Sequence, residues 1–381
     1  MSQTRLSPPL AEREGPTTGL PAEEPRPAGK PLVGRLYILD GLRFVAAMSV
    51  LAFHWTGIDG STRTNWGSNP RHFMPTLFRF TTNGRLGVDL FFLISGFVIC
   101  MSSWDRTPRQ FVTARFTRLF PAYWCAVIVA FVLWQLVPDG VRSVPTITDS
   151  LTNLTMLETP TGAAPLAGAY WTLWIELCFY LLFLPMVRWG LTYTKVSVFA
   201  WVWLLSSLLV DSNVPVLSSF ANHGSTPLFV GGLGLYLIYR FGPDIQLLML
   251  VAASWLVMQN VLVKHVLESN KAGVYDGDPH VTQVVLAACY LIMLAVALHR
   301  FDRLNWRWLS TAGALSYPIY LLHEEMGWAL IRKLRHALGV YPTLGVALVV
   351  VVGSAWLMHR FLEKPLAKYL RAQANRITAH H

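Results

Sequence analysis

Apolar residues occur along the chain in blocks of roughly 15 to 20, separated by short polar and basic stretches. Blocks such as VSVFAWVWLLSSLLV are apolar on every face, whereas a membrane-spanning β-strand alternates over about ten residues. Only a helix satisfies its own backbone hydrogen bonds within such a block. The pattern therefore predicts an all-α fold, a polytopic transmembrane helix bundle with about ten spans. The predicted spans are residues 36–55, 86–104, 119–137, 170–189, 195–210, 226–240, 245–263, 282–299, 309–331 and 342–361.

Polar segments flank the predicted bundle at both ends. Residues 1–34 contain seven prolines and no apolar run, which predicts a disordered tail. Because no apolar core precedes Leu36, the first hydrophobic segment is expected to be retained rather than cleaved. Residues 35–365 are assigned to one membrane domain and residues 366–381 to a basic C-terminal tail. No predicted loop exceeds roughly 32 residues, so the chemistry is expected to reside in the bundle itself.

The composition agrees with a membrane protein. Hydrophobic residues make up 53% of the 381 residues and charged residues only 14%, compared with about 25% charged residues in soluble proteins. The formal net charge is +10, and one set of alternate loops together with the C-terminal tail holds more Lys and Arg residues than the opposite side. The cationic residues that argue the other way are Arg63, Arg71, Arg79, Arg85, Arg332, Lys333 and Arg335. This asymmetry predicts a multi-pass protein of the cell membrane with both termini in the cytoplasm. Because topology accounts for the charge, no nucleic-acid partner is expected.

The four cysteines indicate neither a metal site nor a disulfide. All of them fall within predicted spans, without CxxC spacing: Cys100, Cys125, Cys178 and Cys289. They are interpreted as small core residues, and no metal ligand is predicted.

The first span, LDGLRFVAAMSVLAFHW, carries three ionisable residues: Asp40, Arg43 and His54. Arg43 and His54 are eleven residues apart, which is three helical turns plus roughly 20°, and Asp40 lies within about 40° of the same face. Each such group facing lipid at the bilayer centre costs about 2.5 to 3.5 kcal/mol. This face is therefore expected to line a polar interior. The alternative is an Asp40–Arg43 ion pair at one interface, with His54 reaching the headgroups at the other.

Three further spans supply polar groups that match this face. Glu176 lies inside YWTLWIELCFYLLF with no cationic neighbour in its own helix, so it needs a partner elsewhere. Tyr320 and His323 share a helix face within ALSYPIYLLHEEMGW. Asp89 and Ser95 lie in FTTNGRLGVDLFFLISGFVIC, where the Ser-Gly pair also fits close helix packing.

Arg115 and Arg118 form an i, i+3 pair in WDRTPRQFVTARFTRLFPAYW, just before a predicted span and on the predicted cytoplasmic side. Guanidinium groups so placed suit phosphate oxygens of a lipid headgroup or of a soluble ligand. The alternative is a simple positive anchor at the membrane surface.

Six stretches, taken in this order, resemble the acyltransferase 3 family of integral membrane acyltransferases. They are LDGLRFVAAMSVLAFH, GVDLFFLISGFVI, RFTRLFPAYW, YWTLWIELCFY, LSYPIYLLH and FLEKPLAKYL. The resemblance implies about ten transmembrane helices and transfer of an acyl group from acyl-CoA, bound at the cytoplasmic side, to a hydroxyl group. It implies acyl-CoA as a cosubstrate, no permanently bound cofactor, and a hydroxyl-bearing small molecule or glycan as partner.

The resemblance also implies roles for individual residues. His54 corresponds to the family's essential histidine and Arg43 to its motif partner. Arg115 and Arg118 match the paired arginines near the coenzyme A site. Glu176 matches the acidic residue of a WxLxxE-type motif, although this chain has leucine next to it where many members have a second acidic residue.

The residue chemistry fits this reading. A hydroxyl group needs a base to attack a thioester, and a neutral imidazole at His54 can accept its proton. Asp40 or Glu176 is expected to set the tautomer of that imidazole, and Arg43 to stabilise phosphate, pantetheine carbonyls or the oxyanion. Asp89, Ser95, Tyr320 and His323 are candidate acceptor-binding or supporting residues. Direct transfer and an acyl-histidine intermediate both remain open, and the acceptor is expected to be a carbohydrate or a macrolide-type metabolite.

The main alternative is a multi-span transporter that uses His54, Arg43, Glu176 and His323 as a proton or anion pathway. The two readings differ in one product, because a transporter releases no free coenzyme A from acyl-CoA.

Overall fold

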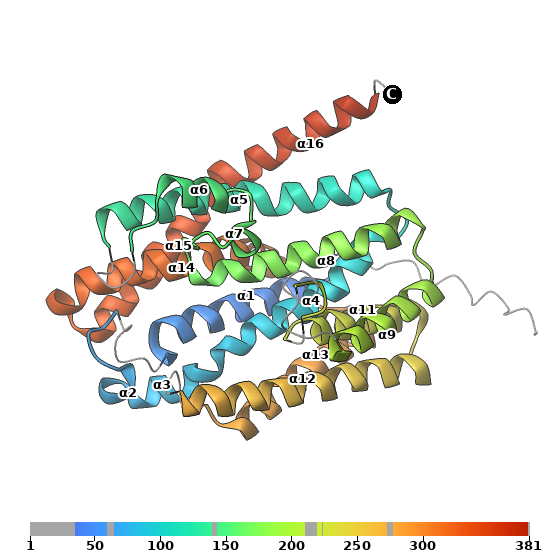
Figure 1. Cartoon of the computed structure of the whole chain (residues 1–381), viewed down its shortest axis with the longest axis horizontal. Helices are drawn as coiled ribbons and strands as arrows, with labels where there is room; N and C mark the ends of the chain where they lie inside the picture. Colours follow the sequence, from blue (N-terminus) through green and yellow to red (C-terminus); the bar gives the residue numbers. More distant parts are fainter. Residues whose placement is uncertain are drawn as a thin grey trace, which may run out of the picture.

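The computed structural model describes residues 35–58, 65–138, 143–209, 219–222, 224–272 and 277–379. Within these ranges the chain is helical, with no β-strand. The helices run side by side along the long axis of the molecule (Figure 1). The tail predicted to be disordered, residues 1–34, lies outside the described residues.

Ten helices in the described part of the chain correspond one to one with the ten predicted spans. They are α1 (Tyr37–Ala52), α4 (Gly87–Ser103), α5 (Pro108–Leu136), α8 (Trp171–Arg188), α9 (Tyr193–Leu209), α11 (Thr226–Phe241), α12 (Ile245–Lys271), α13 (Pro279–Ala297), α14 (Arg307–Leu338) and α15 (Val340–Met358). Seven helical segments there are long and apolar enough to cross a membrane. The predicted all-α polytopic bundle is therefore confirmed.

One boundary differs in a way that matters. The span predicted to begin at residue 119 begins at Pro108, so Arg115 and Arg118 lie inside α5 rather than before it. Thr107 and Gln110 form a capping box, and proline at the first helical position needs no hydrogen-bond partner. The capping box therefore starts the helix before the two arginines, so the helical backbone sets the positions of both.

Glycines allow the central helices to touch. A Cβ atom on Gly96 of α4 would overlap the carbonyl oxygen of Phe229 on α11, and one on Gly232 would overlap that of Leu93. Small residues at such contacts permit close backbone approach, which is how helices associate in lipid. The Ser-Gly pair of α4 therefore serves packing as well as chemistry.

Short elements cover one end of the bundle. They are η1 (Phe53–Gly57), α2 (Pro70–Phe73), α3 (Pro75–Thr81), η2 (Thr82–Leu86), α6 (Ile147–Asn153), α7 (Glu158–Thr161) and η3 (Gly168–Tyr170). This end, where α1 and α5 finish, is called the His54 end, and the opposite end, where α5 starts, is called the Arg115 end.

The chain finishes at the Arg115 end. After α15, a π-helical turn, η4 (His359–Glu363), leads into α16 (Lys364–Ala379). The segment expected to be a basic tail is thus helical over the residues that the structure describes. Figure 1 shows α16 diverging from the other helices beside the start of α5.

Candidate active site

Three cavities lie in series between the two ends of the bundle. The His54 cavity encloses about 460 Å³, the Arg43 cavity about 70 Å³ and the Arg115 cavity about 500 Å³. Val88, Phe92 and Tyr320 line both of the first two cavities. Arg118 lines both of the last two. Because neighbouring cavities share lining residues, the three cavities together are called the route; it is narrow in the middle and wide at both ends.

His54 lies on the π-helical turn that ends the first span, and its ring lines the His54 cavity. Its Nδ1 atom is 2.7 Å from Nε2 of His323 on α14. The two rings stack with their centroids 4.9 Å apart and their planes 25° apart. A π-turn is a frequent device at functional sites, because it changes the direction of side chains along a helix.

The contacts of His323 determine the roles of the ring nitrogens. Its Nδ1 lies 2.7 Å from the carbonyl oxygen of Tyr320, which can only accept, so this nitrogen carries the hydrogen. In a neutral imidazole the other nitrogen, Nε2, is then an acceptor, and Nδ1 of His54 must donate to it. The Nε2 atom of His54 is left with its lone pair. The pair therefore presents a base whose tautomer is set by a backbone carbonyl.

Two tryptophans hold the helices that carry this pair. Nε1 of Trp55 donates to the carbonyl oxygen of His323 at 2.8 Å, and Nε1 of Trp328 donates to that of His54 at 3.3 Å. A Cβ atom on Gly327 would overlap the indole of Trp55. Each indole is thus hydrogen-bonded to the backbone of the segment that carries the other tryptophan. These bonds fix the position of His54 relative to His323.

The prediction that Asp40 or Glu176 sets the tautomer of His54 was wrong. Neither predicted carboxylate makes the hydrogen bond to Nδ1. Asp40 accepts a hydrogen bond from Arg35 at 2.6 Å, at the opposite end of α1. Glu176 lines the Arg43 cavity and is hydrogen-bonded there to Tyr180 and Ser95. His323, considered only as a supporting residue, takes the place that was expected for them.

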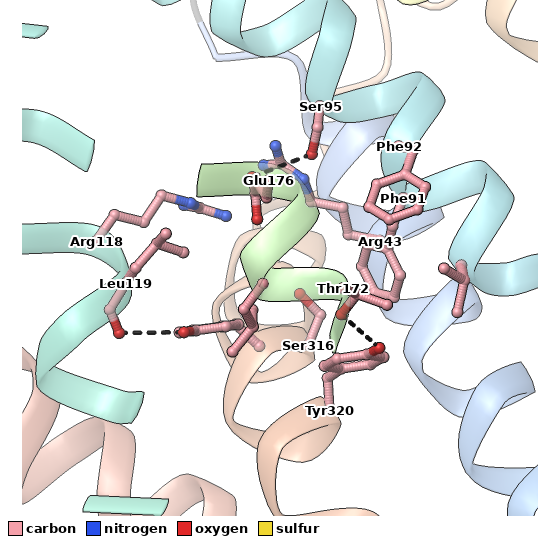
Figure 2. A pocket seen from close by; sticks show the side chains of 13 residues that line it. Arg43, Phe91, Phe92, Ser95, Arg118, Leu119, Thr172, Glu176, Ser316 and Tyr320 are labelled. Atoms are coloured by element: carbon pink, nitrogen blue, oxygen red, sulfur yellow. Dashed lines mark hydrogen bonds between the residues drawn. The ribbon is translucent and has the colours of Figure 1, made fainter. Parts of the chain in front are cut away.

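The Arg43 cavity brings together groups from five helices: α1, α4, α5, α8 and α14. Figure 2 shows Arg43, Glu176 and Arg118 pointing toward the same space. Oε1 of Glu176 accepts hydrogen bonds from Tyr180 at 2.7 Å and from Ser95 at 3.3 Å. This is the partner set that a carboxylate inside the membrane requires. Ser95 therefore makes a polar contact that its packing role alone would not predict.

Tyr320 forms part of the wall between the Arg43 and His54 cavities. Its hydroxyl lies 2.8 Å from that of Thr172 (Figure 2). It also donates to the carbonyl oxygen of Ala169 at 3.1 Å. Thr172 lies one residue from a motif tryptophan, and nothing in its sequence position marked it as a partner. These bonds fix the aromatic ring beside the route.

The His54 cavity is mainly apolar. Its large apolar side chains are Val50, Phe53, Ile58, Val88, Phe92, Trp171, Met258, Val261 and Leu262. Its other charged or titratable side chains are Arg85, Asp89, His265 and Tyr320, so the predicted Asp89 does face the site. A pocket of several hundred cubic ångströms with a few polar groups is typical of small-molecule sites.

The Arg115 cavity is strongly basic. Arg115 donates to the hydroxyl of Ser102, while its Nε is buried without a partner among the described residues. Sequence reasoning identified Arg115 and Arg118 but missed the basic residues that the C-terminal helix adds to the same cavity. The signal available was their spacing, which places Lys364, Lys368 and Arg371 on one helical face.

Comparison with known proteins identifies the family of the chain. A family model described as an acyltransferase domain matches residues 36–360. The chain is 31% identical to Acyltransferase MdmB of Streptomyces mycarofaciens over 159 residues, 40% of this chain and 39% of that protein. It is 37% identical to the exopolysaccharide production protein ExoZ of Rhizobium meliloti over 107 residues, 27% of this chain and 34% of that protein.

A third relative is the peptidoglycan O-acetyltransferase OatA of Listeria monocytogenes, which is 28% identical over 101 residues, 25% of this chain and 13% of that protein. Each of these matches spans less than half the length of the relative. No solved structure matches the chain.

Proposed function

The chain belongs to this acyltransferase family, and from that premise we propose that it is a membrane O-acyltransferase that uses acyl-CoA. The donor enters at the Arg115 end, and the acceptor hydroxyl binds in the His54 cavity. The observation that carries the proposal is the ordered histidine pair, whose His54 lines a cavity that shares Val88, Phe92 and Tyr320 with the Arg43 cavity.

The reaction follows from the free Nε2 lone pair of His54. This atom accepts the proton of the acceptor hydroxyl as its oxygen attacks the thioester carbonyl carbon. The carbon–oxygen bond forms and the carbon–sulfur bond breaks. The leaving thiolate takes the proton from Nε2, so coenzyme A departs as a thiol and His54 returns to its neutral form.

His323 acts as a positioning residue in this step. Its Nε2 accepts from Nδ1–H of His54, which leaves Nε2 of His54 as the nitrogen that can act as a base. When His54 takes up the proton, the same hydrogen bond becomes charge-assisted and stabilises the imidazolium. The carboxylate of a serine protease triad orients its histidine in the same way, and the physical logic is shared.

The middle of the route suits a thin, extended group. The Arg43 cavity of about 70 Å³ admits a linear arm but no ring system of nucleotide size. Arg43 and Arg118 supply donors for the amide carbonyls of a pantetheine arm or for a phosphate oxygen at its far end. Because the two cavities share Tyr320, donor and acceptor can meet directly, which favours direct transfer.

We assign the acceptor to hydroxyl-bearing carbohydrates or macrolide-type metabolites. The aromatic and aliphatic walls of the His54 cavity suit the flat apolar faces that both classes present. ExoZ and OatA, two relatives, are named for an exopolysaccharide and for peptidoglycan. With both termini in the cytoplasm, the His54 end faces outward and the acceptor enters from that side.

The release of free thiol tests the proposal. Purified protein in nanodiscs is given acetyl-CoA, and free coenzyme A is measured with and without cell extract as a source of acceptor. Acyltransfer predicts release that depends on the protein and increases with extract, with acetylated product detected by mass spectrometry. An absence of any release above a no-protein control would refute acyltransfer and favour a transport function for the buried ionisable residues.

A further inference from the structure

The C-terminal helix forms one wall of the basic cavity at the Arg115 end. Nε of Arg371 donates to the hydroxyl of Thr117 at 3.2 Å, and Arg109 donates to the carbonyl oxygen of Ala374 at 3.1 Å. These two bonds connect α16 to the first three turns of α5. The helix therefore has a defined place beside the two arginines of α5.

Cations from two helices face this one cavity. Lys364, Lys368 and Arg371 have i, i+4, i+7 spacing and line it from α16, opposite Arg115 and Arg118 on α5. The cavity also contains Glu363, but its carboxylate is hydrogen-bonded to Nδ1 of His359 at 2.8 Å. Five cations around a single, already paired carboxylate make a site for a polyanion.

The cations form two groups at different depths. Arg118 also lines the narrow Arg43 cavity, so it lies where the route begins. The three α16 residues line only the wide basic cavity. A ligand with two separate phosphate groups fits this arrangement. The phosphate next to a thin arm would lie by Arg118, and the other phosphate would lie further out, by the α16 residues.

We propose that the basic face of α16, formed by Lys364, Lys368 and Arg371, binds the 3′-phosphate at the adenosine end of the acyl-CoA donor. Arg115 and Arg118 then hold the diphosphate, which joins the pantetheine arm. The buried Nε of Arg115, which lacks a partner among the described residues, is available to a diphosphate oxygen. This assignment rests on the proposed function, because it takes acyl-CoA as the donor.

The test compares acetyl-CoA with acetyl-3′-dephospho-CoA as donors for the protein in nanodiscs of zwitterionic lipid. Each charge-assisted hydrogen bond to the extra phosphate is worth on the order of tenfold in affinity, so the wild type should have a KM at least about tenfold lower for acetyl-CoA. The double variant Lys364→Gln/Lys368→Gln should raise the KM for acetyl-CoA about tenfold. It should leave kcat and the KM for the dephospho donor unchanged.

Arg360→Gln is the matched control. Arg360 is an exposed cation of η4 that does not line the basic cavity. Its neutralisation should leave the preference for the 3′-phosphate as in the wild type.

A wild type that uses both donors equally would overturn the proposal, as would a double variant that loses the same factor with each donor. A lipid headgroup is the other source of phosphate. If lipid occupied this face, the defect of the double variant would depend on added anionic lipid and be equal for the two donors. Absence of coenzyme A release from either donor would instead refute the proposed function itself.

Discussion

The two ends of the route are built in opposite ways. At the His54 end, His323 is fully buried, its hydrogen bonds are made within the protein, and tryptophans lock the two helices together. At the Arg115 end, Arg118, Lys364 and Lys368 are exposed around a wide cavity. Under the proposed function, the first arrangement preorganises a base for a bond-making step, whereas the second leaves cations available for the charges of a ligand. The proposal thus separates chemistry and recognition along the bundle.

Removing His54 is expected to have the largest effect. His54→Ala should lower kcat by about 10³-fold or more, because it removes the proposed base, the imidazole that pairs with His323 and lines the His54 cavity. Membrane insertion should persist, since the change removes a polar group from a span. His280→Ala, which removes an exposed histidine at the start of α13, serves as the control. Near-normal turnover by a folded His54→Ala protein would exclude His54 as the base.

Changes at His323 test whether the pair is preorganised. His323→Ala should lower kcat about 10²-fold with little change in the donor KM, because His54 remains but loses its orientation. His323→Gln should recover much of this loss. Its amide oxygen can accept from His54 and its NH₂ group can donate to the carbonyl of Tyr320. Equal losses in the alanine and glutamine variants would indicate that His323 serves packing only.

The arginines of α5 should show the opposite kinetic pattern. Arg118→Ala should raise the donor KM by about tenfold or more while kcat falls less, since a cation for phosphate is removed. Arg118→Lys should recover only part of the affinity, because lysine lacks the bidentate fork. Steady-state kinetics with varied acetyl-CoA distinguishes the two parameters. An Arg118→Ala protein with normal KM and low kcat would contradict the assignment of donor binding to the Arg115 end.

A buried carboxyl in the segment that covers the His54 end gives a smaller, pH-dependent effect. Glu158 on α7 is 2% exposed, and burial raises its pKa to about 7. Because the folded pKa lies above the unfolded value, the folded state is favoured at low pH and loses this stability as pH rises from about 4.5 to about 7. Glu158→Gln should therefore raise the Tm by a few degrees at pH 8 and have little effect at pH 5. The reverse pH dependence would show that the carboxylate is paired in the folded protein.

The fold could be predicted from sequence because each span is an apolar block that only a helix can place in lipid. Helix arithmetic also placed Arg43 and His54 on one face, and both line the route. The partner of His54 could not be predicted in this way. His323 lies 269 residues away, and only the packing of α1 on α14 brings it there.

The C-terminal helix was missed for a different reason. Residues after Met358 are basic and only partly apolar, which matched a tail by composition. The π-helical turn and the contacts with α5 that position α16 depend on tertiary structure. Sequence reasoning therefore identified the chemical groups and their helix faces, but it could not identify the pairings between distant helices.

We propose that one route connects a donor site at the Arg115 end with a base reached from the His54 end. Cysteine labelling tests this sidedness. Single cysteines are placed at His54 and at Arg118 in protein whose four native cysteines are replaced, and a small membrane-impermeant thiol reagent is added to sealed vesicles. His54→Cys should react only from the outer face and Arg118→Cys only from the cytoplasmic face, where acyl-CoA should protect it. Labelling of both positions from the same face would rule out a route between the two sides.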